Sequence, residues 1–90
     1  MKIFSVLDIK AGCYMKPFAD LNTASALRSF CSVTNEKDST FHKFPDDFAL
    51  CEIAEFDMQN GVLTPFDNPI NLGSARTVLN SHDEQIRLAQ

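Results

Sequence analysis

The chain of 90 residues contains no tryptophan and only eight lysine and arginine residues, against twelve aspartates and glutamates. The resulting net charge of −4 argues against a protein held to nucleic acid by bulk electrostatics, since such binding normally draws on an excess of positive charge. No apolar run approaches the roughly 20 residues that a membrane-spanning helix needs. The start, MKIFSVLDIK, has a short apolar run broken by Asp8. We therefore expect neither a membrane protein nor an exported one.

The chain also lacks paired cysteines. Its three cysteines, Cys13, Cys31 and Cys51, are odd in number and widely spaced, which fits neither a disulfide framework nor the ligand spacing of a zinc site. We interpret them as reduced thiols, and we expect Cys31 and Cys51 to behave as small apolar packing residues.

Catalytic and metal-binding motifs are missing as well. His42 with Asp46 and Asp47 could in principle ligate a metal, but no second histidine or cysteine stands at ligand spacing. No nucleophile elbow, phosphate-binding loop or paired-carboxylate signature is present. We therefore expect no enzyme activity, no metal and no cofactor.

The length predicts one domain with a modest core. Hydrophobic residues make up 44% of the chain, including eight phenylalanines and one tyrosine. Chains of this size often gain stability by oligomerisation, so we expect a homodimer. We assign residues 1–80 to a single α+β domain and residues 81–90 to the end of a C-terminal helix or a frayed tail.

The first half of the chain predicts two strands and a helix. Residues 2–9 carry strand-forming residues on both faces of a period-2 pattern, which is typical of an interior strand. Residues 13–18 predict a short strand paired with it, in which Pro17 belongs at an edge because it lacks a ladder donor. Apolar spacing then predicts a helix over residues 23–34, capped by Asn22 or Thr23.

The segment STFHKFPDDF, residues 39–48, is interpreted as a loop that closes this helix and leads into the third strand. The Pro-Asp-Asp run within it is typical of a turn that directs Phe48 into the core. We expect Phe41 and Phe48 to anchor the loop and His42 and Lys43 to point outward.

The second half predicts a hairpin and a helix. Residues 48–56 form the third strand, and Asn60-Gly61 predicts a type I′ turn because both residues tolerate positive φ. Residues 62–66 should therefore fold back on the third strand. Residues 67–71, DNPIN, are interpreted as a turn, and residues 74–89 as an amphipathic helix.

These elements give the order ββαββα. We expect an α+β fold with a small antiparallel sheet of about four strands and helices on one face. We assign Phe30, Phe48 and Phe56 to the core.

Charge is distributed unevenly along the chain. Residues 1–43 hold six basic residues against four acidic ones, and residues 44–90 hold two against eight. A local basic face in the first half is compatible with this asymmetry. Aromatic residues interleaved with lysines there could form a stacking platform for single-stranded nucleic acid. These residues are Tyr14, Lys16, Phe18, Phe41, Lys43 and Phe44.

Four segments in order, KIFSVLDIKAGCYMKPF, ALRSF, FHKFPDDFALCEIAEFD and NLGSA, resemble the small nonstructural protein of the gokushovirus branch of single-stranded DNA microviruses, which infect bacteria. The resemblance runs from Lys2 to about Ala75, and its most specific part lies between Phe41 and Phe48. It implies a protein of the infected host's cytoplasm, absent from the virion. Its role would be in replication, as a DNA-binding protein or a switch that favours making and packaging single-stranded genomes. The resemblance supplies no catalytic motif.

If that role holds, basic side chains contact phosphates and aromatic rings stack on bases. The candidate residues are Lys10, Tyr14, Lys16, Arg28, Phe41, His42, Lys43 and Phe44. The alternative is an acidic dimeric interaction protein that docks on a host or viral replication or assembly protein without contacting DNA. Its final helix could fit a groove on that partner, and deletion of residues 80–90 would then abolish docking while leaving DNA binding intact.

Overall fold

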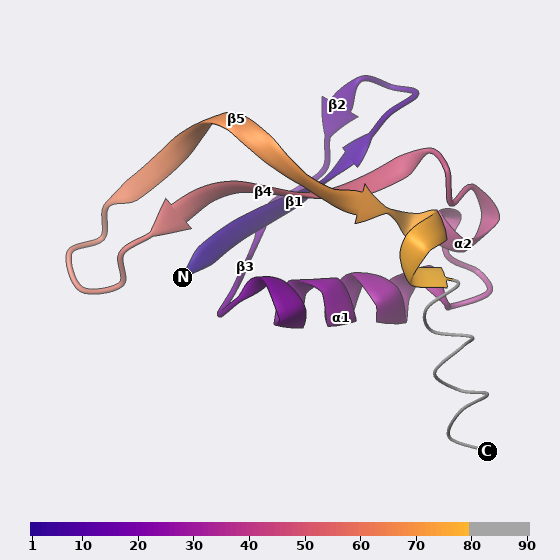
Figure 1. The fold of residues 1–90 in the computed structure, drawn as a ribbon, viewed down its shortest axis with the longest axis horizontal. Coiled ribbons are helices and arrows are strands. Elements are labelled where there is room, and N and C mark those ends of the chain that lie inside the picture. Colours follow the sequence, from indigo (N-terminus) through magenta and orange to yellow (C-terminus); the bar gives the residue numbers. More distant parts are fainter. Residues whose placement is uncertain (80–90) are drawn as a thin grey trace, which may run out of the picture.

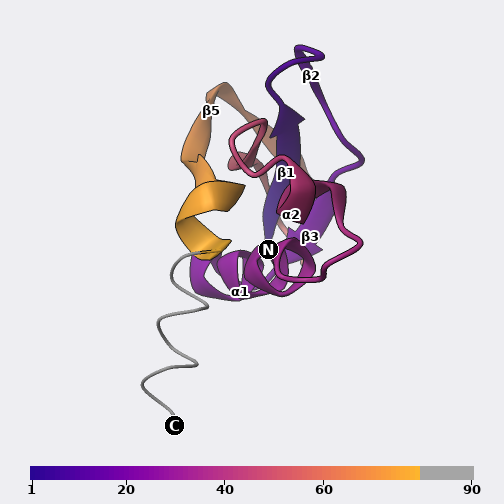
Figure 2. The same ribbon diagram turned by 90° about the vertical axis from the view of Figure 1, so that its right-hand side faces the viewer.

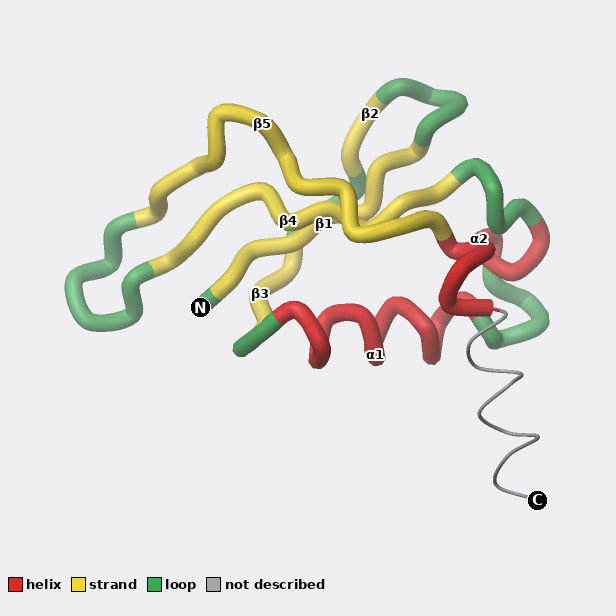
Figure 3. Tube along the Cα trace, viewed as in Figure 1, coloured by secondary structure: helices red, strands yellow, loops and turns green. Residues whose placement is uncertain are grey.

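The central pair of strands in the sheet is β1 (Lys2–Asp8) and β4 (Phe48–Phe56), joined antiparallel along their length. The computed structural model describes residues 1–79, and these form a curled antiparallel sheet in the order β2-β1-β4-β5 (Figure 1). The edges are β2 (Cys13–Tyr14) and β5 (Leu63–Ser74). Helices lie on one face of this sheet, which confirms the predicted α+β class and layer arrangement (Figures 1 and 3).

One edge of the sheet is interrupted at a proline. β2 pairs with the end of β1, and β3 (Phe18–Asp20) pairs with its beginning. Between them the Met15 N–H donates to the Val6 carbonyl at 2.8 Å, and Pro17, which has no N–H, marks the break. The strand predicted over residues 13–18 is therefore two short strands separated at the proline.

α1 (Thr23–Thr34) begins where the sequence predicts. The Asn22 side chain accepts a hydrogen bond from the Ser25 N–H at 2.8 Å and so satisfies one of the backbone donors at the helix start. Ala26, Phe30 and Thr34 are buried at four-residue spacing, so a single stripe of α1 faces the sheet.

The segment after α1 is not the plain loop that the sequence predicted. Thr40–Lys43 form a short helix, α2, because the Ser39 side chain accepts from the Phe41 N–H and caps the turn. The ring of Phe41 packs between those of Phe30 and Phe48, with centroid distances of 5.5 and 4.9 Å. Phe41 and Phe48 therefore anchor this segment, as expected.

The core lies between α1 and the sheet. Its buried members are Phe4, Val6, Ala26, Phe30, Phe48, Leu50 and Ala75. The assignment of Phe56 to the core is wrong, because this residue is only half-buried at the far end of β4. Cys51 is buried and Cys31 is half-buried, in keeping with their expected packing roles.

The β4–β5 hairpin forms as predicted, but through a longer turn. Gly61 has a φ of +74°, whereas no described residue other than glycine has a positive φ, so Asn60 does not adopt the type I′ conformation. The Asp57 N–H donates to the Val62 carbonyl at 2.9 Å, and the Gly61 N–H donates to the Asp57 carbonyl at 2.8 Å. The connection therefore spans residues 57–62.

The predicted turn at residues 67–71 is wrong, because β5 runs through it. Ala54 pairs with Pro65 and Glu52 pairs with Ile70, so the extra residues of β5 are accommodated as a bulge in the strand. β5 is an edge strand and contains two prolines, Pro65 and Pro69.

Residues 75–79 begin the predicted final helix, and Ala75 is fully buried. The remainder of that helix, including His82, lies outside the described residues. The domain limit at residue 80 and the tail over residues 81–90 stay predictions.

Candidate nucleic-acid interface

The β1–β2 turn and the α2–β4 loop meet at one end of the molecule. The Ile9 N–H donates to the Asp47 carbonyl at 2.9 Å, and the Lys10 Nζ lies 4.0 Å from the Asp47 carboxylate. α2 lies between α1 and the β1–β2 turn when the molecule is viewed from this end (Figure 2). We call this region the basic end and define it by Lys10, Tyr14, Lys16, Lys43 and Phe44.

Two aromatic rings at the basic end are open to solvent. Tyr14 is 47% exposed and Phe44 is 56% exposed, although both could have been core residues by type. The Lys10 side chain is 80% exposed, and Lys43 is also exposed. Lys16 is exposed on the same edge of the sheet, two residues beyond Tyr14. These residues combine flat apolar surface with positive charge, which is the chemistry that binds single strands.

The loop over residues 44–47 is held in place by Arg76. The Arg76 Nε and Nη2 donate to the two carboxylate oxygens of Asp46 at 3.1 and 3.0 Å, and the Arg76 N–H donates to the Pro45 carbonyl at 3.1 Å. The guanidinium of Arg76 lowers the pKa of Asp46 by hydrogen bonding and charge attraction. The sequence does not indicate this pair, because no local pattern joins two residues that are 30 positions apart.

Three of the predicted contact residues lie elsewhere or are otherwise engaged. Arg28 is exposed two positions from buried Ala26 on α1, so it lies off the stripe that faces the sheet. Phe41 is packed in the aromatic cluster of the core. The Nδ1 atom of His42 lies 3.2 Å from the Thr34 carbonyl, so the ring tethers α2 to α1. The expectation that Lys43 points outward is confirmed, whereas His42 is only partly exposed.

Of the three cysteines, Cys51 is buried, Cys31 is half-buried and Cys13 is exposed. Burial raises the pKa of the Cys51 thiol, and burial raises that of Cys31 despite a hydrogen bond from Asn35. Within residues 1–79 there is no cluster of three or more histidine, cysteine or acidic residues that could hold a metal ion. No described helix is both long and apolar enough to span a membrane.

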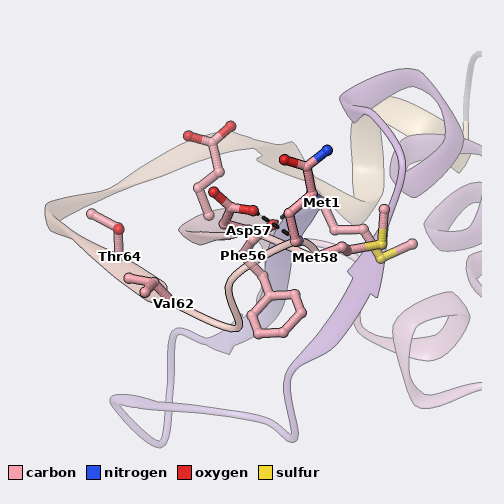
Figure 4. Close-up of a pocket in the computed structure, with 8 residues that line it drawn as sticks. Met1, Phe56, Asp57, Met58, Val62 and Thr64 are labelled. Carbon is pink, nitrogen blue, oxygen red and sulfur yellow. Dashed lines mark hydrogen bonds between the residues drawn. The ribbon is translucent and has the colours of Figure 1, made fainter.

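A hollow of about 410 Å³ lies at the opposite end, beside the tip of the β4–β5 hairpin. Figure 4 shows Met1 and Met58 on one side of it and Val62 and Thr64 on the other. The full lining comprises Met1, Glu55, Phe56, Asp57, Met58, Gln59, Val62 and Thr64. The hollow is not expected from the sequence, which places Phe56 in the core.

Comparison with known proteins gives one finding. A family model described as phage ORF5 protein matches residues 1–78, which is most of the chain. Neither the curated proteins nor the solved structures gave a match. The matched range contains every described strand, α1, α2 and all eight predicted contact residues. The chain therefore belongs to the phage ORF5 protein family.

Proposed function

We propose that the protein is a nonstructural protein of a gokushovirus-type phage, and that it acts in replication and packaging of the single-stranded genome by binding DNA at the basic end. Its place of action would be the cytoplasm of the infected bacterium, outside the virion. The observation that carries the proposal is the exposure of Tyr14 and Phe44 beside Lys10 and Lys43, in a chain of the phage ORF5 family.

The proposed role of each residue follows from the chemistry of its side chain. Lys10, Lys16 and Lys43 contact phosphates, while Tyr14 and Phe44 stack on bases. Each stacked base contributes on the order of 1–3 kcal/mol and requires little sequence readout. Arg28 takes no part, and Phe41 and His42 support the loop from within the protein.

Lys10 can bind a DNA phosphate even though its amino group lies close to the carboxylate of Asp47. The two groups are 4.0 Å apart and the lysine side chain is 80% exposed. Exposed ion pairs of this kind contribute about 0–1 kcal/mol. Exchanging the carboxylate for a DNA phosphate therefore costs little, and the fixed position of the β1–β2 turn is kept by the Ile9 backbone bond.

The test is a titration of a labelled single-stranded oligonucleotide with the purified protein at several salt concentrations, with the matched duplex as comparison. We expect salt-sensitive binding that prefers the single strand. In the double variant Lys16→Gln/Lys43→Gln, the slope of log K against log salt should become shallower by about 1.4, because each lost phosphate contact on a single strand removes roughly 0.7.

The control is Arg28→Gln/Lys37→Gln, which removes the same charge from two exposed residues outside the basic end. It should keep the wild-type slope. An equal decrease of the salt slope in both double variants would show that total charge, not the basic end, governs DNA binding.

The second candidate function is docking on a host or viral replication or assembly protein without DNA contact. It is favoured by one observation, the hollow at the hairpin tip with exposed Met58 and Val62 around it. Failure of the folded protein to bind either form of DNA at low salt would reject the first function in favour of this one.

A further inference from the structure

We propose that the hairpin tip of one copy docks onto the basic end of a second copy, so that two chains form an antiparallel, closed dimer. We call the hairpin tip, together with the adjoining Asp67 of β5, the acidic end and define it by Glu55, Asp57, Met58, Val62, Leu63 and Asp67. The inference concerns self-association and does not depend on DNA binding.

The acidic end presents apolar surface with negative charge. Met58, Val62 and Leu63 are 64%, 52% and 55% exposed, and none belongs to the core cluster. The hairpin over residues 53–71 contains Glu55, Asp57 and Asp67 but no lysine or arginine. A complementary surface must therefore combine apolar groups with positive charge.

Two positive groups beside this hairpin, the Met1 amine and Lys2, already have partners. The Met1 amine donates to the Phe56 carbonyl at 2.8 Å, and the Phe56 N–H donates back to the Met1 carbonyl at 2.7 Å. The Lys2 Nζ lies 3.1 Å from the carboxylate of Glu52, which is buried. Glu55, by contrast, is exposed at the rim of the hollow.

The acidic end is also held in one shape before any partner arrives. The Asp57 carboxylate accepts from the Gln59 N–H at 2.9 Å, and the Asn60 side chain accepts from the Val62 N–H at 2.9 Å. These bonds fix the turn at the far left of Figure 1. A turn that is already ordered loses little entropy on docking.

The basic end of the same chain has the matching chemistry. Ile9, Met15 and Phe44 are 49%, 45% and 56% exposed, and Lys10 and Lys43 stand among them. The acids of this region have intramolecular partners. Asp46 is bound by Arg76, Asp47 lies beside Lys10, and the Asp8 side chain accepts from the Ala11 N–H at 3.0 Å.

The positions of the two ends favour a closed pair. The hairpin tip and α2 lie at opposite ends of the long direction of the molecule (Figure 1). When two copies lie antiparallel, each acidic end meets the partner's basic end, and the contact occurs twice. In such a twofold arrangement both surfaces of each copy are buried. The assembly therefore closes at two copies and does not grow into a filament.

The first measurement is mass by sedimentation without DNA at two ionic strengths, where the Debye length is about 30 Å at about 0.01 M and about 3 Å at about 1 M. We expect twice the mass of one chain at low salt and a shift toward one chain at high salt. A single-chain mass in both conditions would overturn the proposal.

A charge exchange tests the contact itself. Glu55→Lys/Asp67→Lys makes both ends positive, and Lys10→Glu/Lys43→Glu makes both ends negative. Each double variant alone should have the mass of one chain, and an equimolar mixture should restore the dimer. The control Glu36→Lys/Asp38→Lys changes the net charge as the first variant does, at exposed residues of the loop after α1, and should stay dimeric.

Persistence of the dimer in either charge variant, or failure of the mixture to associate, would overturn the proposed contact.

Circular dichroism establishes that the variants are folded. Should the charge variants not fold, Met58→Ser changes the acidic end without altering charge, and it should weaken the dimer. An unchanged dimer in Met58→Ser would count against the proposal. Because DNA is absent throughout, these results leave the proposed DNA binding unaffected.

Discussion

Arg76 and Asp46 fix the loop of the basic end by a two-point contact between exposed side chains. The pKa of Asp46 in the folded chain lies below the ordinary value of 3.8, chiefly because of the hydrogen bonds from Arg76. A carboxyl group with a lowered pKa stabilises the fold at pH values above its unfolded pKa. That stabilisation is lost as the pH falls through the folded pKa.

Removing this carboxylate should change how the free energy of unfolding depends on pH in the acidic range. The Asp46→Asn variant should be less stable than wild type near neutral pH, and the two stabilities should converge as the pH falls through the lowered pKa of folded Asp46. Urea unfolding at a series of pH values measures this. Asp38→Asn, an exposed aspartate in the loop after α1, is the control and should follow wild type. Parallel curves for wild type and Asp46→Asn would contradict the role of the pair.

At the scale of elements, the start of α1 depends on a single side chain. The Asn22 oxygen accepts from the Ser25 N–H at 2.8 Å, and that donor has no partner within the helix. Replacing such a cap by alanine typically costs about 1 kcal/mol of folding free energy.

The variant Asn22→Ala should therefore lower the free energy of unfolding by about 1 kcal/mol, and Asn22→Ser should lower it much less because serine also caps helices. Denaturant unfolding at neutral pH measures both. Equal stability of the two variants would show that the hydrogen bond to Ser25 does not hold the helix start.

Elements with local signals could be predicted, and those set by distant contacts could not. The cap and apolar spacing of α1, the apolar pattern of β1 and the glycine of the β4–β5 turn all act over a few residues. In contrast, residues 67–71 have the composition of a turn, but pairing with β4 draws them into β5 as a bulge. The same limit applies to the site. Lysines and aromatic residues can be identified by type, but only the fold separates exposed Phe44 from packed Phe41.

At the scale of the whole molecule, the basic end would bind both DNA and the acidic end of a second copy if both proposals hold. The carboxylates of a second copy and the phosphates of DNA would then compete for Lys10 and Lys43. Self-association would keep the DNA-contacting surface covered until DNA is abundant. DNA should therefore convert dimers into complexes that contain one chain at each binding site.

The charge variants make this competition measurable. Glu55→Lys/Asp67→Lys should lose the dimer and bind single-stranded DNA at least as tightly as wild type. Lys10→Glu/Lys43→Glu should lose both activities. Sedimentation of the wild-type protein with increasing DNA should show the dimer disappearing as the complex forms. A complex that retains two chains on one short oligonucleotide would contradict the competition.

The outer edge of β5 affects the tendency of the protein to aggregate at high concentration. A twelve-residue strand at the border of a sheet would normally offer backbone groups to a neighbouring chain, and such templates seed fibrous aggregates. Pro65 and Pro69 have no N–H to offer, and the bulge between them disturbs the regular spacing of the remaining groups. Two missing donors and an irregular register therefore disfavour the pairing of this border with the strand of another chain.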